Sequence, residues 1–478
     1  MAEMRQYILL TALLVVSVLP SIYPQPSQQL VPEVLFANVE SGVLVLGGFV
    51  ESGRQTFPLL GIASDSISAA YFLRIRGYLL SSVAHGDIFF YVGTAYVNGL
   101  PAILLVQLRM GEEPRVKVIH SDLPLYGTDL LLVNGTLYIA GYIYRYTPVV
   151  ESDIILIKYN YTTGEIEGSL VLGSIAFDDY PKRILSDGTS IIVIGDTYAY
   201  NVSQSDVLIA KVTPVLTLIG DVAVGGAGRE TVEDAVLVDD ASLLIIGSTI
   251  GGTGTPDAFI VKVSDVGGLT YLSAVVGYEN EYAVSALRLR NTYAVALYGR
   301  FEEDSNLTLL ANYTSKDPWT MDLLTLIVVN SSAGRVTPLR SRSSALAFKS
   351  GSYVVVLYPE KRAMCLEESC ATIELDLLDF GEYAHKFFAG LYGWKPLRSV
   401  VKARESPALQ TSELQIQAEK IPISNSKLSI SMGKYARRVN PVREVIVFIE
   451  RNMPLLLFMP MLVAAALLIL ETRKRGWS

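Results

Sequence analysis

A short apolar run that recurs about every fifty residues is the feature that most constrains the fold of this 478-residue chain. Each copy is rich in β-branched and aromatic residues and ends in glycine or its equivalent. The marker positions are Gly47, Gly93, Gly141, Gly195, Gly247, Gly299 and Pro359. The six glycines are 46, 48, 54, 52 and 52 residues apart. A fixed period of this length is typical of stacked or radially arranged supersecondary units.

Each repeat contains four segments with strand character. The marker run is followed by a loop and a second apolar segment, in which Asp153, Asp206 and Asp257 align. One further candidate strand precedes the marker run, and another follows the second apolar segment. Four short strands per unit, repeated radially, compose the blade of a β-propeller. The sequence therefore predicts an all-β propeller of seven four-stranded blades over residues 31–392, with a C-terminal transmembrane helix. An open β-solenoid is the alternative, although its coils are commonly shorter.

These units resemble the bacterial and archaeal SBBP-type β-propeller repeats. The resemblance is clearest in Asp179–Val212 and Glu233–Val263, which carry the marker glycine, the aligned aspartate and a later lysine. It fades toward both ends, because the first and last units lack the aspartate and the lysine. The resemblance implies an exported or surface protein and no particular enzymatic activity.

The two ends of the chain predict its location. Residues 1–24 combine a short polar start with an apolar segment, which predicts a signal peptide or, alternatively, an uncleaved N-terminal anchor. Met453–Leu470 holds 18 residues without a charge, enough for a helix of ~27 Å to cross a bilayer. Arg473, Lys474 and Arg475 follow it, so residues 471–478 are expected to be a cytoplasmic tail. We expect a single-pass protein of the cell membrane with a large extracellular domain and the lipid bilayer as a partner.

Two further features suit an extracellular domain. The chain has six N-glycosylation sequons, each expected in a turn or loop, at Asn134, Asn160, Asn201, Asn306, Asn312 and Asn330. Cys365 and Cys370, the only cysteines, are expected to close a short disulfide loop, with free thiols as the alternative. Residues 393–444 mix polar with alternating apolar positions, which indicates either a stalk or a small β addition packed on the propeller.

No sequence motif identifies catalytic chemistry. The net charge of -8 and the lack of a basic cluster argue against nucleic acid as a partner. The glycine clusters at Gly225 and Gly251 lack the strand-to-helix context of a phosphate-binding loop. The three histidines His85, His120 and His385 lie far apart in the sequence. We therefore predict no catalytic set, no metal site and no cofactor.

A candidate ligand surface combines acidic and aromatic residues in the turns that lead into successive blades. Its members are Asp178, Asp179, Tyr180, Glu233, Asp234, Tyr278, Glu279, Glu281 and Tyr282. In a propeller these turns would converge near the mouth of the central channel, where carboxylates and tyrosines suit a cation, a sugar or a basic partner. The alternative is that they are solvated turn residues whose aspartates cap nearby backbone groups.

These observations favour a binding or scaffold module at the cell surface, with an envelope protein or a glycan as partner. The alternative is an extracellular propeller enzyme, a hydrolase or dehydrogenase, whose site is assembled from residues far apart in the sequence. A sensor is less favoured, because eight residues after Leu470 are too few for a signalling domain.

Overall fold

The structure is a computed structural model, and its described part runs from residue 30 to residue 434. The gaps within it are 65–66, 147–149, 175, 202–203, 227, 240–241, 251–255, 265–269, 277–281, 290–291, 299–307, 318–319, 334, 342–345, 359–360, 380–388, 391–394 and 398–400. The chain divides into two units, Met1–Gly433 and Lys434–Ser478, and the description that follows concerns the first.

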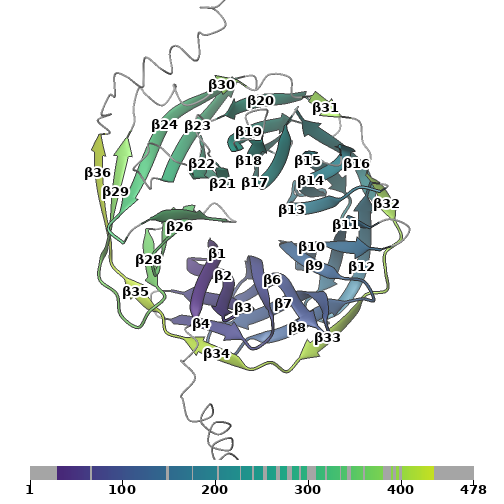
Figure 1. The fold of residues 1–478 in the computed structure, drawn as a ribbon, viewed down its shortest axis with the longest axis horizontal. Helices are drawn as coiled ribbons and strands as arrows, with labels where there is room; N and C mark the ends of the chain where they lie inside the picture. Colours follow the sequence, from purple (N-terminus) through teal and green to yellow (C-terminus); the bar gives the residue numbers. More distant parts are fainter. Residues whose placement is uncertain are drawn as a thin grey trace, which may run out of the picture. The chain divides into compact units, whose positions relative to one another are not determined.

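The strands form antiparallel sheets, each of which begins with consecutive strands of the chain (Figure 1). We name each sheet as a blade by its first strand. The β1 blade contains β1 (Val31–Glu40), β2 (Val43–Ser52), β3 (Gln55–Ala63) and β4 (Ser68–Leu73). The β5 blade contains β5 (Gly77–His85), β6 (Ile88–Val97), β7 (Leu100–Arg109) and β8 (Arg115–His120). The β9 blade contains β9 (Leu125–Val133), β10 (Thr136–Arg145), β11 (Glu151–Asn160) and β12 (Glu165–Gly173).

The remaining blades follow the same order. The β13 blade contains β13 (Asp179–Ser186), β14 (Ile191–Asn201), β15 (Gln204–Val212) and β16 (Leu218–Gly225). The β17 blade contains β17 (Arg229–Asp239), β18 (Ser242–Ile250), β19 (Pro256–Ser264) and β20 (Thr270–Val276). The β21 blade contains β21 (Tyr282–Leu289), β22 (Thr292–Tyr298), β23 (Thr308–Asp317), β24 (Thr320–Ser331) and β29 (Ile373–Asp379). The β25 blade contains β25 (Val336–Leu339), β26 (Leu346–Ser350), β27 (Tyr353–Tyr358) and β28 (Arg362–Cys365).

The blades close into a ring, which makes the fold a β-propeller. The first strand of each blade lies at the centre and contacts a neighbouring blade, and β1 contacts β25 and β26 of the last blade (Figure 1). Ala37 N donates to Arg340 O at 3.0 Å across this closure. The cores lie between adjacent blades: Phe36 and Leu60 of the β1 blade, for example, share one apolar cluster with Phe89 and Leu104 of the β5 blade.

The predicted fold class was wrong as stated. Six sheets have five strands and one has six, so the blades are not four-stranded. In the described part of the chain, no helix is long and apolar enough to cross a membrane. Residues 1–24, Met453–Leu470 and 471–478, on which the membrane and export predictions rest, lie outside the described residues. The strand number was missed because the additional strands come from a distant part of the chain.

The extra strands come mainly from the C-terminal segment 389–434, which we call the belt. Its strands are β30 (Ala389–Gly390), β31 (Lys395–Leu397), β32 (Lys402–Arg404), β33 (Gln410–Leu414), β34 (Ala418–Ile421), β35 (Ser424–Ser426) and β36 (Leu428–Lys434). They pair in this order with β20, β16, β12, β8, β4, β28 and β29. The belt therefore passes once around the rim of the ring and covers the outer edge of every blade (Figure 1). The belt strands become the outermost strands of the sheets, and short edge strands such as the three-residue β32 limit pairing with another chain. The belt overlaps residues 393–444, for which the sequence left a stalk or a β addition open.

The marker glycines lie opposite a β-bulge in the first strand of the blade. Gly195 pairs with Pro181, next to the bulge at Lys182. A Cβ at Gly195 would lie 2.0 Å from the Tyr180 carbonyl oxygen, and one at Gly93 would lie 2.0 Å from that of Tyr78. Glycine is required at these positions because the bulge presses a backbone carbonyl against the neighbouring strand.

The structure also corrects the alignment of the repeats. In the β1 blade Gly48 rather than Gly47 faces the carbonyl, since a Cβ at Gly48 would lie 2.0 Å from Glu33 O. In the β21 blade the equivalent residue is Leu297, which pairs with Ala283 beside the bulge. Gly299 and Pro359 lie outside the described residues.

Substitution of Gly195 by alanine tests this close approach. We expect Gly195→Ala to lower the free energy of unfolding by about 2 to 3 kcal/mol, because the methyl group must displace a backbone carbonyl. Gly220→Ala is the matched control: Gly220 also lies in a strand, and a Cβ there would have no atom within 4 Å. The measurement is urea unfolding followed by fluorescence. Equal stability of the two variants would contradict the close approach.

A half-buried arginine anchors the belt to the β9 blade. Arg404 forms ion pairs with Glu151 and with Asp153, the latter at 2.9 Å from Nη1 to Oδ2, and its Nη2 donates to Ser174 O at 2.9 Å. The Asp153 side chain is 0% exposed, and that of Arg404 is 19% exposed. A second belt pair, Arg74 with Glu419, has side chains 47% and 31% exposed.

These two pairs should differ in their effect on stability. We expect Arg404→Met to lower the free energy of unfolding by about 3 kcal/mol, because it leaves the buried Glu151 carboxylate without its cation and removes one of the two cations of the buried Asp153 carboxylate. Arg74→Met removes a similar belt contact at the surface and should cost less than about 1 kcal/mol. Thermal unfolding of both variants checks this ordering, and a larger loss in Arg74→Met would refute it.

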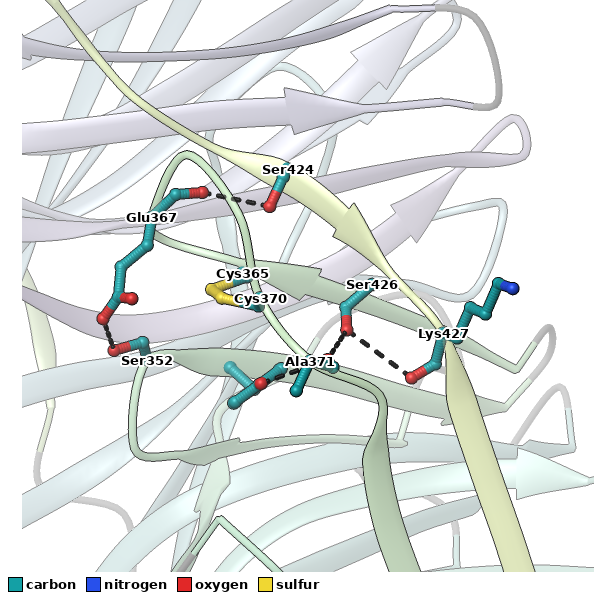
Figure 2. The surroundings of a disulfide bond; sticks show 9 residues. Ser352, Cys365, Glu367, Cys370, Ala371, Ser424, Ser426 and Lys427 are labelled. Carbon is teal, nitrogen blue, oxygen red and sulfur yellow. Dashed lines mark hydrogen bonds between the residues drawn. A yellow bond between two sulfur atoms is a disulfide. The ribbon is translucent and has the colours of Figure 1, made fainter.

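A disulfide joins Cys365 and Cys370 beneath the belt. Figure 2 shows that the disulfide loop and the residue after it meet β35: Ser424 Oγ donates to Glu367 O in the loop at 3.0 Å, and Ser426 Oγ donates to Ala371 O just after Cys370 at 2.7 Å. Cys365, Glu367 and Cys370 are also the one grouping of three potential metal ligands among the described residues. Since the two sulfur atoms are bonded to each other, they do not offer thiolates to a metal.

Candidate functional site

A buried polar network occupies the centre of the ring. Ser81, Asp129, Arg183, Asp234 and Ser285 follow the bulge in successive first strands, and each is at most 3% exposed. Ser81 Oγ donates to Asp129 Oδ1 at 2.5 Å, and Arg183 Nε lies 2.7 Å from Asp234 Oδ1. Asp129 and Asp234 also accept backbone N–H groups, from Ile184 and Ala286, both at 2.9 Å. Polar groups this deeply buried need such partners.

Two arginines extend this network between blades that are not neighbours in the ring. Arg183 Nη2 donates to Ser341 O, and Arg340 Nη2 donates to Lys182 O. These contacts join the β13 blade to the β25 blade. Two guanidinium groups and the two carboxylates of Asp129 and Asp234 balance in charge. The described polar groups at the centre of the ring thus form ion pairs and hydrogen bonds with one another or with the backbone of neighbouring strands.

The structure places the residues of the predicted ligand surface in different parts of the ring. Asp178 Oδ1 accepts hydrogen bonds from Ser152 N at 2.8 Å and Ser152 Oγ at 2.6 Å. Asp179 is buried and accepts from Ser174 N and Ser174 Oγ, both at 2.7 Å. Both aspartates thereby join the β13 blade to the β9 blade. Burial raises the pKa of Asp179 to about 6.

The other predicted residues lie elsewhere. Asp234 belongs to the axial network and is equivalent to Arg183 rather than to Asp179, and Glu233 is the bulged residue beside it. Tyr282 is the first residue of β21. Tyr278, Glu279 and Glu281 lie outside the described residues.

Tyrosines gather on one face of the ring around the channel mouth. They come from the start of the first strand and the end of the second strand in the β5, β9 and β13 blades, and each is half-buried. We call them the tyrosine arc, which comprises Tyr78, Tyr96, Tyr126, Tyr142, Tyr144, Tyr180 and Tyr198. Among the predicted surface residues that the structure describes, Tyr180 belongs to this arc, and Asp178 and Asp179 directly precede it in the chain.

The rings of the arc contact one another within and between blades. Tyr126 and Tyr142 stack with centroids 4.6 Å apart, and Tyr142 meets the edge of Tyr180 in the next blade at 5.1 Å. An arginine lies at each end: the guanidinium carbon of Arg76 is 4.5 Å from the centroid of Tyr96, and Arg229 Nη2 donates to Tyr198 OH at 3.1 Å. These contacts hold the rings in place.

The hydroxyl groups of Tyr126, Tyr142 and Tyr180 in the arc stay protonated at physiological pH. Burial raises the pKa of Tyr126 to about 12 and also raises the pKa values of Tyr142 and Tyr180. The neutral hydroxyls can therefore both donate and accept hydrogen bonds at physiological pH.

The arc has a sequence signal that the search for chemical motifs missed. Tyr78 and Tyr96, Tyr126 and Tyr144, and Tyr180 and Tyr198 form three pairs, each 18 residues apart. The second member follows the marker glycine by three positions, and the first is the residue whose carbonyl faces that glycine. Aligning the repeats on the glycines, and then comparing the columns beside them, would have found the pairs.

The glycosylation sequons lie partly within strands. Asn134 lies in a turn, and Asn160 and Asn201 end strands β11 and β14. Asn312 and Asn330 lie inside β23 and β24, so the expectation of a turn or loop was wrong for these two. Asn306 lies outside the described residues, as does His385.

Comparisons with known proteins show only remote likenesses. No family model matches the chain, and no curated protein matches it. Because no family model matches, the resemblance to SBBP-type repeats is not confirmed. The chain is similar to a subtype N10 neuraminidase-like protein of A/little yellow-shouldered bat/Guatemala/060/2010, with 10% identity, a TM-score of 0.36 and coverage of 71% of this chain and 94% of that one. It is similar to the Bombyx mori GH32 β-fructofuranosidase BmSUC1 with 10% identity, a TM-score of 0.28 and coverage of 90% and 98%. Likenesses at these TM-scores carry no argument about function, and the propeller assignment rests on the ring of sheets.

A buried carboxylate pair lies between the β13 and β17 blades. Glu230 is 0% exposed and Asp206 is 6% exposed. Burial raises the pKa of Asp206 to about 6, and burial together with the Asp206 charge raises that of Glu230 to about 7. The aligned Asp153 is paired with Arg404 of the belt, but the belt residue at the equivalent register beside Asp206 is Leu397. An apolar residue there cannot neutralise the pair.

This pair predicts that stability falls with rising pH. Its folded pKa values exceed the ordinary values of 3.8 and 4.5, so the folded state binds the protons more tightly than the unfolded state. The stabilising contribution of the two protonated carboxyl groups to the free energy of unfolding is complete below about pH 4. It is lost as the pH rises through 6 to 7. We expect Glu230→Gln to raise the free energy of unfolding at pH 8 by up to about 3 kcal/mol and to change little at pH 4.

Urea unfolding of the wild type and Glu230→Gln at both pH values checks this expectation. Glu167→Gln is the control, because the exposed Glu167 pairs with Lys158 and its pKa is lowered. That variant should gain no stability at pH 8. A Glu230→Gln variant destabilised equally at both pH values would contradict the assignment.

Proposed function

We propose that this chain is a binding module whose tyrosine arc recognises another protein. The observation that carries the proposal is the recurrence of the tyrosine pair in three successive blades, which places seven half-buried rings on one face between Arg76 and Arg229. Tyrosine and arginine are enriched among the residues that dominate binding energy at protein interfaces. Rings that are already held in place lose little conformational entropy on binding.

The axial network supports binding rather than catalysis. A propeller hydrolase or dehydrogenase with its site on the axis would need acidic or basic groups that can meet a substrate. The axial carboxylates of Asp129 and Asp234 are instead buried against Arg183 and accept backbone N–H groups. The described face of the ring offers neutral hydroxyls and aromatic surface, which suit recognition.

The proposal includes the location of the protein. The apolar segments near both ends of the chain support export and attachment to the lipid bilayer, with the propeller outside the cell and an envelope protein as its partner. Membership of the SBBP-type repeats is part of the same proposal. Accessibility of the propeller to protease added to intact cells tests this location.

A photo-crosslinking experiment on intact cells tests the arc. Tyr144 or Tyr198 of the full chain is replaced by p-benzoylphenylalanine, a crosslinking aromatic residue of related shape. We expect irradiation to join either position to one dominant partner protein, and Tyr180→Ala introduced into the same chain should reduce the adduct at least about fivefold through the loss of one interface hot spot.

Tyr161 is the matched control for this experiment. It is also half-buried, but it follows β11 at the opposite face of the ring. The crosslinker at position 161 should give no such adduct. The proposal fails if positions 144, 161 and 198 give the same adducts, or if the adducts are unaffected by Tyr180→Ala.

A further inference from the structure

A cavity of about 560 Å³ opens at the rim of the ring, where the belt passes from the β9 blade to the β5 blade. It lies on the same face as the tyrosine arc, because β8 and β10 both end there. The polar lining residues that carry the argument are His120, Asp122, Arg145, Glu405 and Gln410. Leu123, Pro407 and Ala408 provide apolar wall. A volume of this size is typical of a small-molecule site.

Hydrogen bonds hold the walls of this cavity in place. Arg145 Nε lies 2.8 Å from Asp153 Oδ2, and its Nη2 donates to Glu405 O at 2.7 Å. His120 Nε2 lies 2.9 Å from Ser412 Oγ, and Ser406 Oγ lies 2.6 Å from Ser169 Oγ. The belt is thereby fastened on both sides of the cavity, so a ligand would meet a preformed site.

We propose that this rim cavity binds a neutral saccharide unit. The five polar side chains are all planar, and together they offer both donors and acceptors. A carboxylate, an amide or a guanidinium group presents two hydrogen-bonding atoms in a fixed fork. Such a fork matches two neighbouring hydroxyl groups of a sugar ring, while Leu123 and Pro407 suit the apolar face of the same ring.

Other ligand classes fit the cavity less well. The carboxylates of Asp122 and Glu405 outnumber the guanidinium of Arg145, which disfavours an anion. Within the described part of the chain, the one grouping of three potential metal ligands is at Cys365 rather than in this cavity. A peptide that bound as an added strand would pair with a sheet edge, and the edge strands beside this cavity, β32 and β33, are only three and five residues long, which leaves little backbone to pair with.

The cavity adjoins the tyrosine arc without sharing its side chains. Tyr144 N donates to Pro124 O at 3.1 Å, which joins the cavity loop at Leu123 to the arc. Saccharide binding would be a second recognition function on the same face. It does not depend on the proposed protein partner.

Calorimetric titration of the full chain in lipid nanodiscs tests the inference. The probes are the methyl glycosides of glucose, galactose and mannose and linear trisaccharides of each sugar. We expect at least one probe to bind, and Asp122→Asn and Gln410→Ala each to weaken that binding about tenfold or more, as the loss of a hydrogen bond to a charged group or of a bidentate contact implies. Both residues are exposed, so the thermal midpoints should stay unchanged.

Two control variants separate this site from the tyrosine arc. Tyr161→Ala at the opposite face and Tyr198→Ala in the arc should leave the saccharide affinity unchanged. Tyr198→Ala should still weaken the photo-crosslink from position 144, so failure of one proposal is distinguishable from failure of the other. The inference is overturned if no probe binds or if Asp122→Asn and Gln410→Ala bind as the wild type does. The inference would also be overturned if neutral tripeptides, rather than the saccharides, bound to the cavity.

Discussion

The contact between a bulged first strand and the marker glycine of the next strand organises each of the blades in which it occurs. The carbonyl of Tyr180 would lie 2.0 Å from a Cβ at Gly195, so the two strands approach this closely only because glycine has no side chain. The resulting bulge changes the direction in which the side chains on either side of it point. The residue two positions before it, such as Tyr180, contributes to the channel mouth, and the residue after it, such as Arg183, joins the axial network. One backbone constraint thereby generates both the tyrosine arc and the buried polar centre.

The belt stabilises the ring by a different means. Local hairpins build each blade, but they leave its outer edge unpaired, and the belt pairs with those edges one after another. Its attachment is uneven, because Arg404 pairs with buried carboxylates in the β9 blade, while the residue at the equivalent register beside Asp206 and Glu230 is the apolar Leu397. Stability is therefore coupled to pH at one junction between blades and to ion pairing at another.

The two proposed binding sites lie on one side of the ring. The tyrosine pairs occur in the β5, β9 and β13 blades, and the rim cavity lies where the belt passes between the first two of these. Both features lie on the face where the first strands begin and the second strands end. The opposite face carries Tyr161 at the end of β11, which contacts His85 and Phe90 and lies apart from the arc. A partner that met the arc would approach the cavity at the same time.

The amino-acid sequence by itself determined the repeat, the all-β propeller fold and the glycines that mark each blade. Neighbouring strands of a blade are joined by short turns, so their pattern is readable in a local stretch of chain. The course of the belt around the ring is visible only in the tertiary structure. Its strand β32 pairs with β12 across more than two hundred residues and is too short to carry a sequence pattern of its own. The tertiary structure also decided that Asp234 aligns with Arg183 rather than with Asp179, since a bulge shifts the register without changing the residues around it. The rim cavity was likewise beyond the sequence, because its walls come from two blades and the belt, which only folding brings together.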